Sequence, residues 1–305
     1  MKRFSGLFVL LVVAACKDAP PPREVSGEQL LAYVDTQLAF GPRIPGSDGH
    51  RRMGRWLDSL LRTRADTVLV DDWVHVTGRG DTLPLRNVLA RFRPAAPRRV
   101  LYVAHWDTRP RADAKTSTDT LAPVPGANDG ASGVALLLGV ADALRASPPN
   151  VGVDLLFVDG EDFGSFDDST ETLLGSRRFA RQLPPGSQPA FAIVWDMVGD
   201  REQRLLQEAW SLTAAPALVE QVWVRAAALG YGDRFVAKAD RPAIDDHLPL
   251  QQAGIAAIDV IDFDYGPENR WHHTTEDTRD KLSGESLAVA AHVAMALLRG
   301  ADRVQ

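Results

Sequence analysis

Cysteine is almost absent from this chain: the 305 residues contain a single one, at position 16 near the N-terminus. An internal disulfide needs two thiols and a thiolate metal site needs several, so both are excluded from the rest of the chain. Any metal ion would have to be held by histidine and carboxylate side chains. A basic excess is also missing, since the formal net charge is −6 and the pI is near 5.7. We therefore expect no nucleic-acid partner, because nucleic-acid recognition usually needs a clustered basic face.

Long apolar runs are scarce, and the clearest one lies close to the N-terminus. It covers residues 7–13, follows Lys2 and Arg3, and ends in small residues before Cys16, which is the pattern of a signal peptide. The run is too short to span a bilayer. Residues 13–16 resemble the lipobox of bacterial lipoproteins, whose cysteine is lipidated after cleavage; an ordinary signal peptide with an incidental cysteine is the alternative.

These features predict where the protein resides. We expect residues 1–15 to be a signal peptide that is removed, and Cys16 to carry a lipid that binds the membrane. Residues 16–26 contain three successive prolines, which favour a stiff, extended tether. The protein is then exported and anchored at the bacterial cell envelope, with its folded part in the periplasm or outside.

The composition beyond the tether is that of a globular chain, with 45% hydrophobic and 24% charged residues overall. Strand-like and helical patterns alternate, and several strand patterns are almost wholly apolar, as in strands buried on both faces. We therefore predict one α/β domain over residues 27–305, with a mainly parallel sheet covered by helices on both faces. The expected strands are residues 67–70, 87–91, 100–104, 153–158, 191–195 and 255–261. The expected helices are two between residues 27 and 61, then 134–144, 173–183, 214–229, 247–253 and 285–298.

Polar residues follow several of the expected strands at their carboxyl ends. In open α/β sheets, ligands bind outside these ends, so one cleft could collect all of these side chains. The residues concerned are His105, Asp107, Asp159, Glu161, Asp162 and Asp196.

Each of these residues also has an ordinary structural explanation. His105 could be a hydrogen-bonded loop histidine, and Asn128 or Asp129 could cap the helix that follows them. Glu161 and Asp162 could belong to a solvated acidic turn. Adjacent buried carboxylates, however, repel each other unless a cation lies between them or one holds a proton.

Asp196 and two later motifs strengthen the case for a metal. Asp196 ends a strand that is too apolar to host a charge without a partner. Asp245 and Asp246 open a short helix, where capping would explain only one of the two acids. His272 and His273 offer imidazoles in a loop before the last helix. Together these residues fit a three- or four-ligand zinc site with an open position.

The same residues, in the same order, resemble a known enzyme family. The matching motifs are His105-Trp106-Asp107, Asn128-Asp129-Gly130-Ala131-Ser132-Gly133, Asp159-Gly160-Glu161-Asp162, Asp196, Asp245-Asp246-His247 and His273-Thr274-x-x-Asp277-Thr278. They are similar to the zinc-dependent M28 peptidase superfamily over about residues 30–300. Residues 174–177, 245–249 and the tryptophan before the histidines are more similar to the animal-type glutaminyl-peptide cyclotransferases and their bacterial relatives. The resemblance implies the three-layer fold of zinc exopeptidases, with a mostly parallel mixed sheet.

The resemblance also implies roles for individual residues. Asp129, Asp162 and His273 would bind one zinc ion, with His272 as the alternative imidazole, and Glu161 would be the acid and base. Asp162 stands where the superfamily usually has the longer glutamate.

In the aminopeptidases of the superfamily, the positions of His105 and Asp196 bind a second zinc ion. In the cyclases one zinc ion suffices, and the positions of Asp196 and Asp246 form a hydrogen-bond network with the substrate. Trp271 and Phe263 would wall the substrate pocket, although both could equally be core residues.

The expected activity is therefore conversion of N-terminal glutamine to pyroglutamate with release of ammonia. An aminopeptidase that uses the same zinc site and the same Glu161 is the first alternative. A surface-anchored protein that binds peptides without turnover is the second. All three take a peptide or small protein with a free N-terminus as the partner.

Overall fold

The computed structural model of the chain describes residues 24–165, 171–184 and 186–301. The expected signal peptide and Cys16 lie outside these residues. The expected tether is described only at its last three residues. Of these, Val25 is buried and Ser26 caps the first helix, so the packed part of the chain begins before Gly27.

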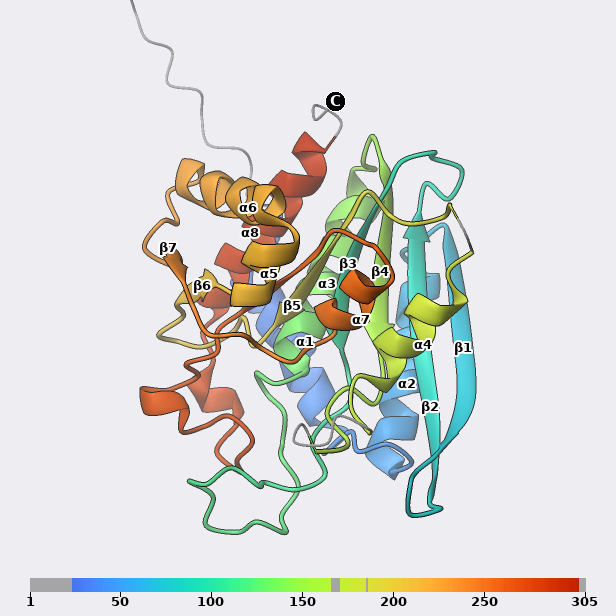
Figure 1. Ribbon diagram of the computed structural model, residues 1–305, viewed down its shortest axis with the longest axis vertical. Coiled ribbons are helices and arrows are strands. Elements are labelled where there is room, and N and C mark those ends of the chain that lie inside the picture. The colour runs from blue at the N-terminus through green and yellow to red at the C-terminus, as the bar shows by residue number, and fades with distance from the viewer. Residues whose placement is uncertain (1–23, 166–170, 185, 302–305) are drawn as a thin grey trace, which may run out of the picture.

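A six-stranded mixed sheet forms the centre of the molecule (Figure 1). Its strand order is β1-β2-β4-β3-β5-β8, and its last four strands run parallel. The antiparallel pair β1 and β2 extends it at one edge. The strands are β1 (Thr67–Val76), β2 (Thr82–Phe92), β3 (Arg99–His105), β4 (Gly152–Val158), β5 (Phe191–Asp196) and β8 (Ala257–Ile261).

Helices cover both faces of the sheet, as the sequence predicts. On one face lie α1 (Gly27–Leu38), α2 (Asp48–Arg62), α3 (Ala131–Ala146) and α8 (Gly284–Gly300). On the other face lie α4 (Leu174–Gln182) and α7 (His247–Gln252). Serine hydroxyls at positions 26, 47 and 283 accept backbone N–H bonds at the starts of α1, α2 and α8, which satisfies donors that a helix cannot pair internally.

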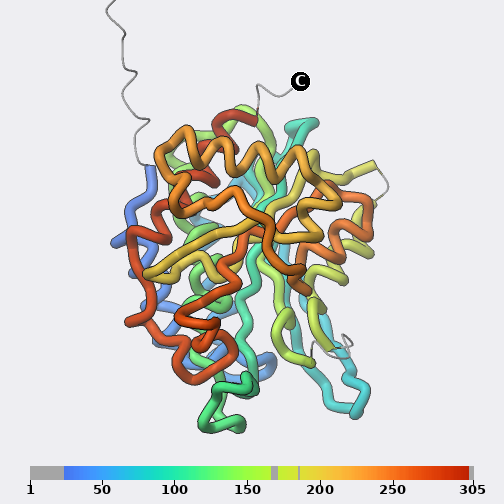
Figure 2. The backbone as a smooth tube through the Cα atoms, turned by 60° about the vertical axis from the view of Figure 1, so that its left-hand side comes forward, coloured from blue at the N-terminus to red at the C-terminus, as the bar shows by residue number. Residues whose placement is uncertain are grey.

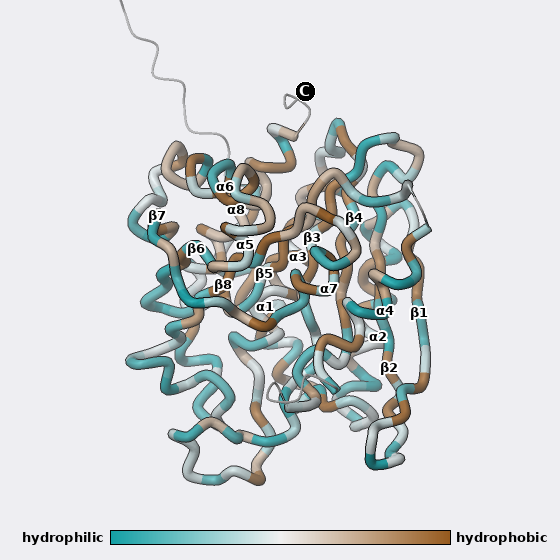
Figure 3. Tube along the Cα trace, in the orientation of Figure 1, coloured by the Kyte–Doolittle hydropathy of each residue, from teal (hydrophilic) through white to brown (hydrophobic). Residues whose placement is uncertain are grey.

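Alternating side chains of the central strands build two cores. Along β3, Tyr102 belongs to the larger core beneath α3 and α8, whereas Leu101 and Val103 belong to the smaller core beneath α4 and α7. This period of two is why the strand reads as a continuous apolar run. Figure 3 shows hydrophobic colour along these strands and polar colour on many of the outer loops. Among the described residues, no helix is long and apolar enough to cross a membrane.

The structure departs from the predicted elements in three places. First, β1 and β2 form a much longer hairpin than the expected strands 67–70 and 87–91. Second, the helix expected over 214–229 is present as α6 (Pro216–Ala228), but a further short helix before it, α5 (Ala209–Ala214), was not foreseen; Pro216 separates the two by beginning a new helix. Third, a small parallel sheet of β6 (Leu205–Gln207) and β7 (Phe235–Ala239) was not foreseen.

Chain order and spatial order reverse at β3. The chain passes from β3 to β4 on one side and then crosses to β5 on the other. Such a reversal opens a crevice outside the carboxyl ends of the strands. His105, the last residue of β3, therefore stands where a ligand site is expected.

Close packing of α3 against β5 yields a stability prediction. A Cβ atom added at Gly133 would lie 2.1 Å from the carbonyl oxygen of Trp195, a backbone atom that cannot rotate away. We expect Gly133→Ala to lower the free energy of unfolding by about 1–3 kcal/mol or more, as overpacking does. Chemical denaturation would measure this loss. Gly232→Ala is the control, because its nearest neighbour would be 3.8 Å away; equal stability of the two variants would contradict the prediction.

Candidate active site

A cavity of about 480 Å³ opens at the carboxyl ends of the parallel strands. It gathers residues that are distant in the sequence: most end or follow one of the strands β3, β4, β5, β7 and β8, and Asp129 lies just before α3. The sequence-predicted residues that line it are Asp129, Glu161, Asp196, Phe263, His272 and His273. Of the six polar strand-end residues expected in one cleft, Glu161 and Asp196 line the cavity. His105 and Asp162 contact residues that line it.

The three predicted zinc ligands meet at the imidazole of His273. Its Nε2 atom lies 3.5 Å from Oδ2 of Asp129 and 3.4 Å from Oδ1 of Asp162. Tetrahedral ligands at about 2.0–2.1 Å from a zinc ion lie roughly 3.3 Å apart. Each acid thus lies at a ligand-like distance from His273. The groups of described residues whose ligand atoms all lie within 4.8 Å of one another do not include Asp162, so the carboxylates of Asp129 and Asp162 would have to move closer together to share an ion.

His272 stands next to this group. Its Nε2 atom lies 4.0 Å from Oδ2 of Asp129, and ligand atoms of Asp129, His272 and His273 all lie within 4.8 Å of one another. His273 lies within 4.0 Å of two of the predicted acids, whereas His272 lies that close to Asp129 alone among the predicted ligands described. This geometry favours His273, and its role as a ligand stays a prediction.

A second cluster of potential ligands adjoins the first and shares Asp129. The Nε2 atom of His105 lies 3.1 Å from Oδ1 of Asp129 and 3.3 Å from Oδ1 of Asp196. Burial would lower the pKa of His105, but Asp107, Asp129 and Asp196 raise it well above its usual value. The cluster can therefore hold either a second cation or a proton on His105.

The donor set fits zinc for a further reason. Several buried ligand atoms have no hydrogen-bond partner among the described residues, although such atoms are costly to leave unpaired. They are Oδ2 of Asp129, Oδ2 of Asp162, Oδ1 of Asp196 and both ring nitrogens of His105. Burial also lowers the pKa of His272 and, more strongly, of His273, which keeps both imidazoles in the neutral form that binds metal.

Two fully buried carboxylates hold the predicted ligands in place. Asp107 accepts hydrogen bonds from the backbone N–H groups of Glu161 and Asp162, at 3.1 and 3.2 Å. Asp277 accepts hydrogen bonds from those of Asn128 and Asp129, at 2.8 and 3.2 Å. Each carboxylate thus fixes one ligand-bearing turn.

The structure corrects the suggestion that Asp107 is a potential ligand beside His105. Both of its oxygens are engaged with the backbone of the turn after β4. The helix-capping alternative for Asn128 and Asp129 is wrong as well. Helix α3 begins after Gly130 without a side-chain cap, and the Asn128 side chain instead bonds to the backbone of Met197 and Gly199.

Arg43 is a site-supporting residue that the sequence did not reveal. Its guanidinium is fully buried and donates to the carbonyl oxygens of Pro125 and Gly126, each at 2.7 Å. Burial lowers its pKa to about 10, so it still carries its charge at neutral pH, facing Asp107, Asp129 and Asp277. A single arginine in a Gly/Pro-rich loop gives no sign in the sequence that it will be buried.

Glu161 has the surroundings expected of an acid and base. It is 6% exposed and lines the cavity. Burial raises its pKa well above the usual value, and the charges of Asp162, Asp245 and Asp246 add to this while His105 opposes it. A carboxyl group with a raised pKa can both accept and return a proton near neutrality.

Three other predicted acids fall in different places. Asp246 is fully buried and accepts a hydrogen bond from the Ser176 hydroxyl at 2.5 Å, while its neighbour Asp245 lines the cavity. Asp246 occupies the cap position of α7 without making a cap bond, so capping does not explain it. Asp159 points away from the cleft and bonds to the His50 ring at 2.8 Å, which corrects its grouping with the cleft residues.

The two predicted pocket aromatics behave differently. Phe263 lines the cavity and meets the His272 ring edge to face, with centroids 5.5 Å apart. Trp271 is not among the described residues that line it; its ring packs against Tyr265 and lies under the Lys281 ammonium. The core-packing alternative therefore describes the contacts of Trp271 in this structure.

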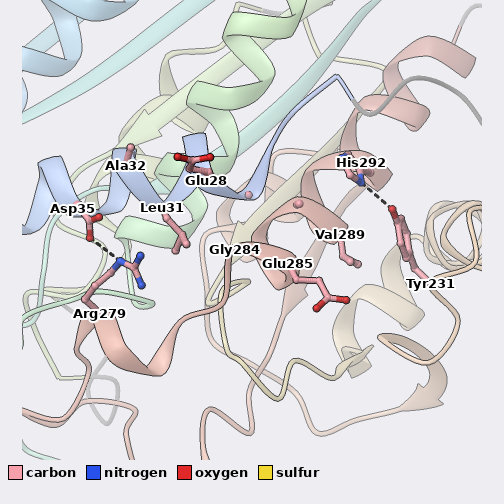
Figure 4. Close-up of a pocket in the computed structure, with 12 residues that line it drawn as sticks. Glu28, Leu31, Ala32, Asp35, Tyr231, Arg279, Gly284, Glu285, Val289 and His292 are labelled. Atoms are coloured by element: carbon pink, nitrogen blue, oxygen red, sulfur yellow. Dashed lines mark hydrogen bonds and ion pairs between the residues drawn. The ribbon is translucent and has the colours of Figure 1, made fainter.

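A larger cavity, of about 700 Å³, lies between α1 and α8 (Figure 4). Four of its polar side chains form two pairs: Asp35 binds Arg279 at 2.6 Å, and the Tyr231 hydroxyl bonds to His292 at 2.8 Å. Neither metal-binding group found among the described residues lies there. The cavity at the strand ends is therefore the candidate active site.

Comparison with known proteins agrees with this geometry. The model of peptidase family M28 matches residues 87–298. The glutaminyl cyclase of Porphyromonas gingivalis superposes with a TM-score of 0.86 at 34% identity, covering 92% of this chain and 99% of that one. A Zn-dependent exopeptidase from Parabacteroides distasonis also gives 0.86, at 32% identity and the same coverage.

Among curated sequences, the glutaminyl-peptide cyclotransferase of Gloydius blomhoffii is 24% identical, over 79% of this chain and 72% of its own length. The expected three-layer fold and the expected family are thus both confirmed, and the family implies zinc. A non-catalytic peptide binder is correspondingly disfavoured. The chain belongs to peptidase family M28 and is an enzyme of the glutaminyl cyclase or metallo-exopeptidase type.

Proposed function

We propose that this enzyme is a zinc-dependent glutaminyl-peptide cyclotransferase, which converts N-terminal glutamine of peptides to pyroglutamate and releases ammonia. The observation that carries the proposal is the placement of Glu161, a buried carboxyl group that opens on the cavity beside the predicted zinc ligands. The named glutaminyl cyclases that share nearly the whole fold at 31–34% identity support the choice of reaction.

Asp129, Asp162 and His273 would hold the zinc ion, with one coordination position open. When bound there, zinc supplies Lewis acidity: it polarises the side-chain amide carbonyl of glutamine and stabilises negative charge on that oxygen. The unpartnered oxygens of Asp129 and Asp162 are the atoms available for this role.

The protein's own residues would bind the substrate amine and move its protons. The cavity is lined by Asp129, Glu161, Asp196 and Asp245, which suits an N-terminal amino group. Glu161 takes a proton from the α-amine as its nitrogen attacks the side-chain amide carbon. The bond from that carbon to the amide nitrogen then breaks, and Glu161 returns the proton to the departing ammonia.

Asp196 and Asp246 would assist in different ways. Asp196 reaches the cavity directly and could accept a hydrogen bond from the substrate amine. Asp246 is held by Ser176 out of the cavity, and its charge helps to raise the pKa of Glu161. Their part in catalysis is a prediction of this proposal.

An M28-type aminopeptidase is the second candidate, and one observation favours it. His105, Asp129 and Asp196 bring ligand atoms within 4.8 Å of one another, so the site could take a second zinc ion. In that case Glu161 would deprotonate a water molecule that attacks the peptide carbonyl.

Two peptides that differ only in their first residue separate the candidates. We expect purified, zinc-loaded enzyme to release ammonia from a Gln-initiated peptide, which lowers the mass of the peptide by the mass of ammonia. The Leu-initiated peptide should stay intact. Mass spectrometry and an ammonia assay measure both products. Release of free leucine, without ammonia from the glutamine peptide, would refute cyclisation and favour the aminopeptidase.

Two substitutions distinguish proton transfer from metal binding. We expect Glu161→Gln to keep its zinc and lose at least about 100-fold in kcat, because it retains size but not the base. Asp129→Ala should lose the zinc itself. Metal analysis and kcat measurements test both, with Glu220→Gln, an exposed residue of α6, as the unaffected control. A Glu161→Gln variant with full activity would show that Glu161 is not the residue that transfers the proton.

We also propose that the protein is exported and anchored through a lipid on Cys16. The supporting pattern is the basic start, the short apolar run and the lone cysteine of the sequence. In a bacterial host, we expect the wild type in the membrane fraction and Cys16→Ala in the soluble fraction. Immunoblots of the two fractions decide this, and an identical distribution of the two proteins would contradict lipid anchoring.

A further inference from the structure

The segment of residues 109–124 connects the end of β3 to the turn that bears Asp129, and it runs past the mouth of the cavity. It forms the green loop at the bottom of Figures 1 and 2, beside the orange-red chain that precedes α8. Its two ends are joined by a hydrogen bond from the Val124 N–H to the Arg109 carbonyl, at 3.2 Å. Arg109 and Ala114 line the cavity.

Arg109 ties this loop to one of the predicted zinc ligands. Its Nη1 atom donates to Oδ1 of Asp162 at 2.5 Å, and its side chain is 6% exposed. The other side of the same guanidinium donates to both oxygens of Asp113, at 2.7 and 2.8 Å. The planar group thus bridges a ligand and a loop carboxylate, a geometry for which arginine is suited and lysine is not.

The loop also holds a second predicted ligand. The Ala114 N–H and the Ser117 hydroxyl both donate to the carbonyl oxygen of His273, at 3.3 and 3.4 Å. His273 has a φ of 55°, a left-handed conformation that is uncommon for a residue with a side chain. Such a conformation persists only where surrounding contacts impose it.

Arg109 therefore restrains the side chain of Asp162, a contact that the sequence motifs do not reveal. Asp162 is one methylene shorter than glutamate, so its reach depends closely on where its carboxylate is held. Asp107 fixes the backbone of Asp162 and Arg109 fixes its side chain. With Oδ1 engaged by Arg109, Oδ2 is buried and without a hydrogen-bond partner.

We propose that residues 109–124 form a zinc-site clamp, in which Arg109, braced by Asp113, is a positioning residue for Asp162 while the loop backbone positions His273. The proposal rests on the zinc site of the proposed function. Arg109 is not an anion-binding residue of the substrate pocket, because the described contacts commit its guanidinium to two carboxylates.

Zinc affinity tests the clamp without reference to turnover. The variants are Arg109→Met, which removes the charge, Arg109→Lys, which keeps the charge but not the fork, and Asp113→Asn, which loosens the brace. Competition with a chromogenic zinc chelator gives the dissociation constant of each purified protein. Arg64→Lys is the matched control, because Arg64 forms a similar ion pair with Asp142, at 2.9 Å, away from the cavity.

We expect the zinc dissociation constant to rise 10- to 100-fold in Arg109→Met, the range typical for groups that orient metal ligands. Arg109→Lys and Asp113→Asn should show smaller rises, and Arg64→Lys none. The melting temperature of each metal-free variant shows whether it is folded. If Arg109→Met does not fold, Asp113→Asn carries the test, since the Asp113 side chain is 49% exposed.

Failure of the clamp is distinguishable from failure of the proposed function. Wild-type enzyme that binds zinc and forms pyroglutamate, together with folded Arg109→Met and Asp113→Asn variants of unchanged zinc affinity, would overturn the clamp alone. Wild-type enzyme that binds no zinc would overturn both.

Discussion

Burial of negative charge at the carboxyl ends of the parallel strands is the constraint on which the rest of this structure depends. Asp129, Glu161, Asp162 and Asp196 are all at most 7% exposed. Three of them line one cavity, and Asp162 contacts His273 in its wall. Carboxylates removed from water are costly unless they are hydrogen-bonded, paired or bound to a metal. Among the described residues, the groups that offset this cost are backbone N–H groups, the imidazoles and the buried guanidinium groups of Arg43 and Arg109.

Hydrogen bonding divides the buried acids into two kinds. Asp107 and Asp277 each accept two consecutive backbone N–H bonds and so act as a framework. Asp129, Asp162 and Asp196 each keep a buried oxygen without a hydrogen-bond partner. A divalent cation is the natural complement to this second kind, which is why zinc explains the site better than any set of internal ion pairs.

The sequence predicted the parts of the fold that depend on local apolar patterns. Strands such as β3 and β4 are buried on both faces and read directly as apolar runs. The full length of the β1–β2 hairpin was not predicted, because β1 is an edge strand whose apolar pattern is interrupted by Asp71 and Asp72. The break between α5 and α6 had a signal in Pro216, whereas the short strand β6 had none.

The residues of the site that belong to sequence motifs could be predicted from the order of those motifs. The residues that support the site through contacts between distant segments could not. His273 meets Asp129 and Asp162 as expected. The buried Arg43 and the bridging role of Arg109 depend on contacts between distant segments, which composition and spacing cannot express. Asp107 was noticed for its place beside His105, but only the fold shows that it holds the neighbouring turn.

Anomalous X-ray scattering at the zinc absorption edge, from crystals of the zinc-loaded enzyme, tests the central claim most directly. The account predicts a strong anomalous peak within about 2.0–2.2 Å of ligand atoms of Asp129, Asp162 and His273. A peak elsewhere, or none at this cavity in zinc-loaded crystals, would contradict the convergence of these side chains on one ion.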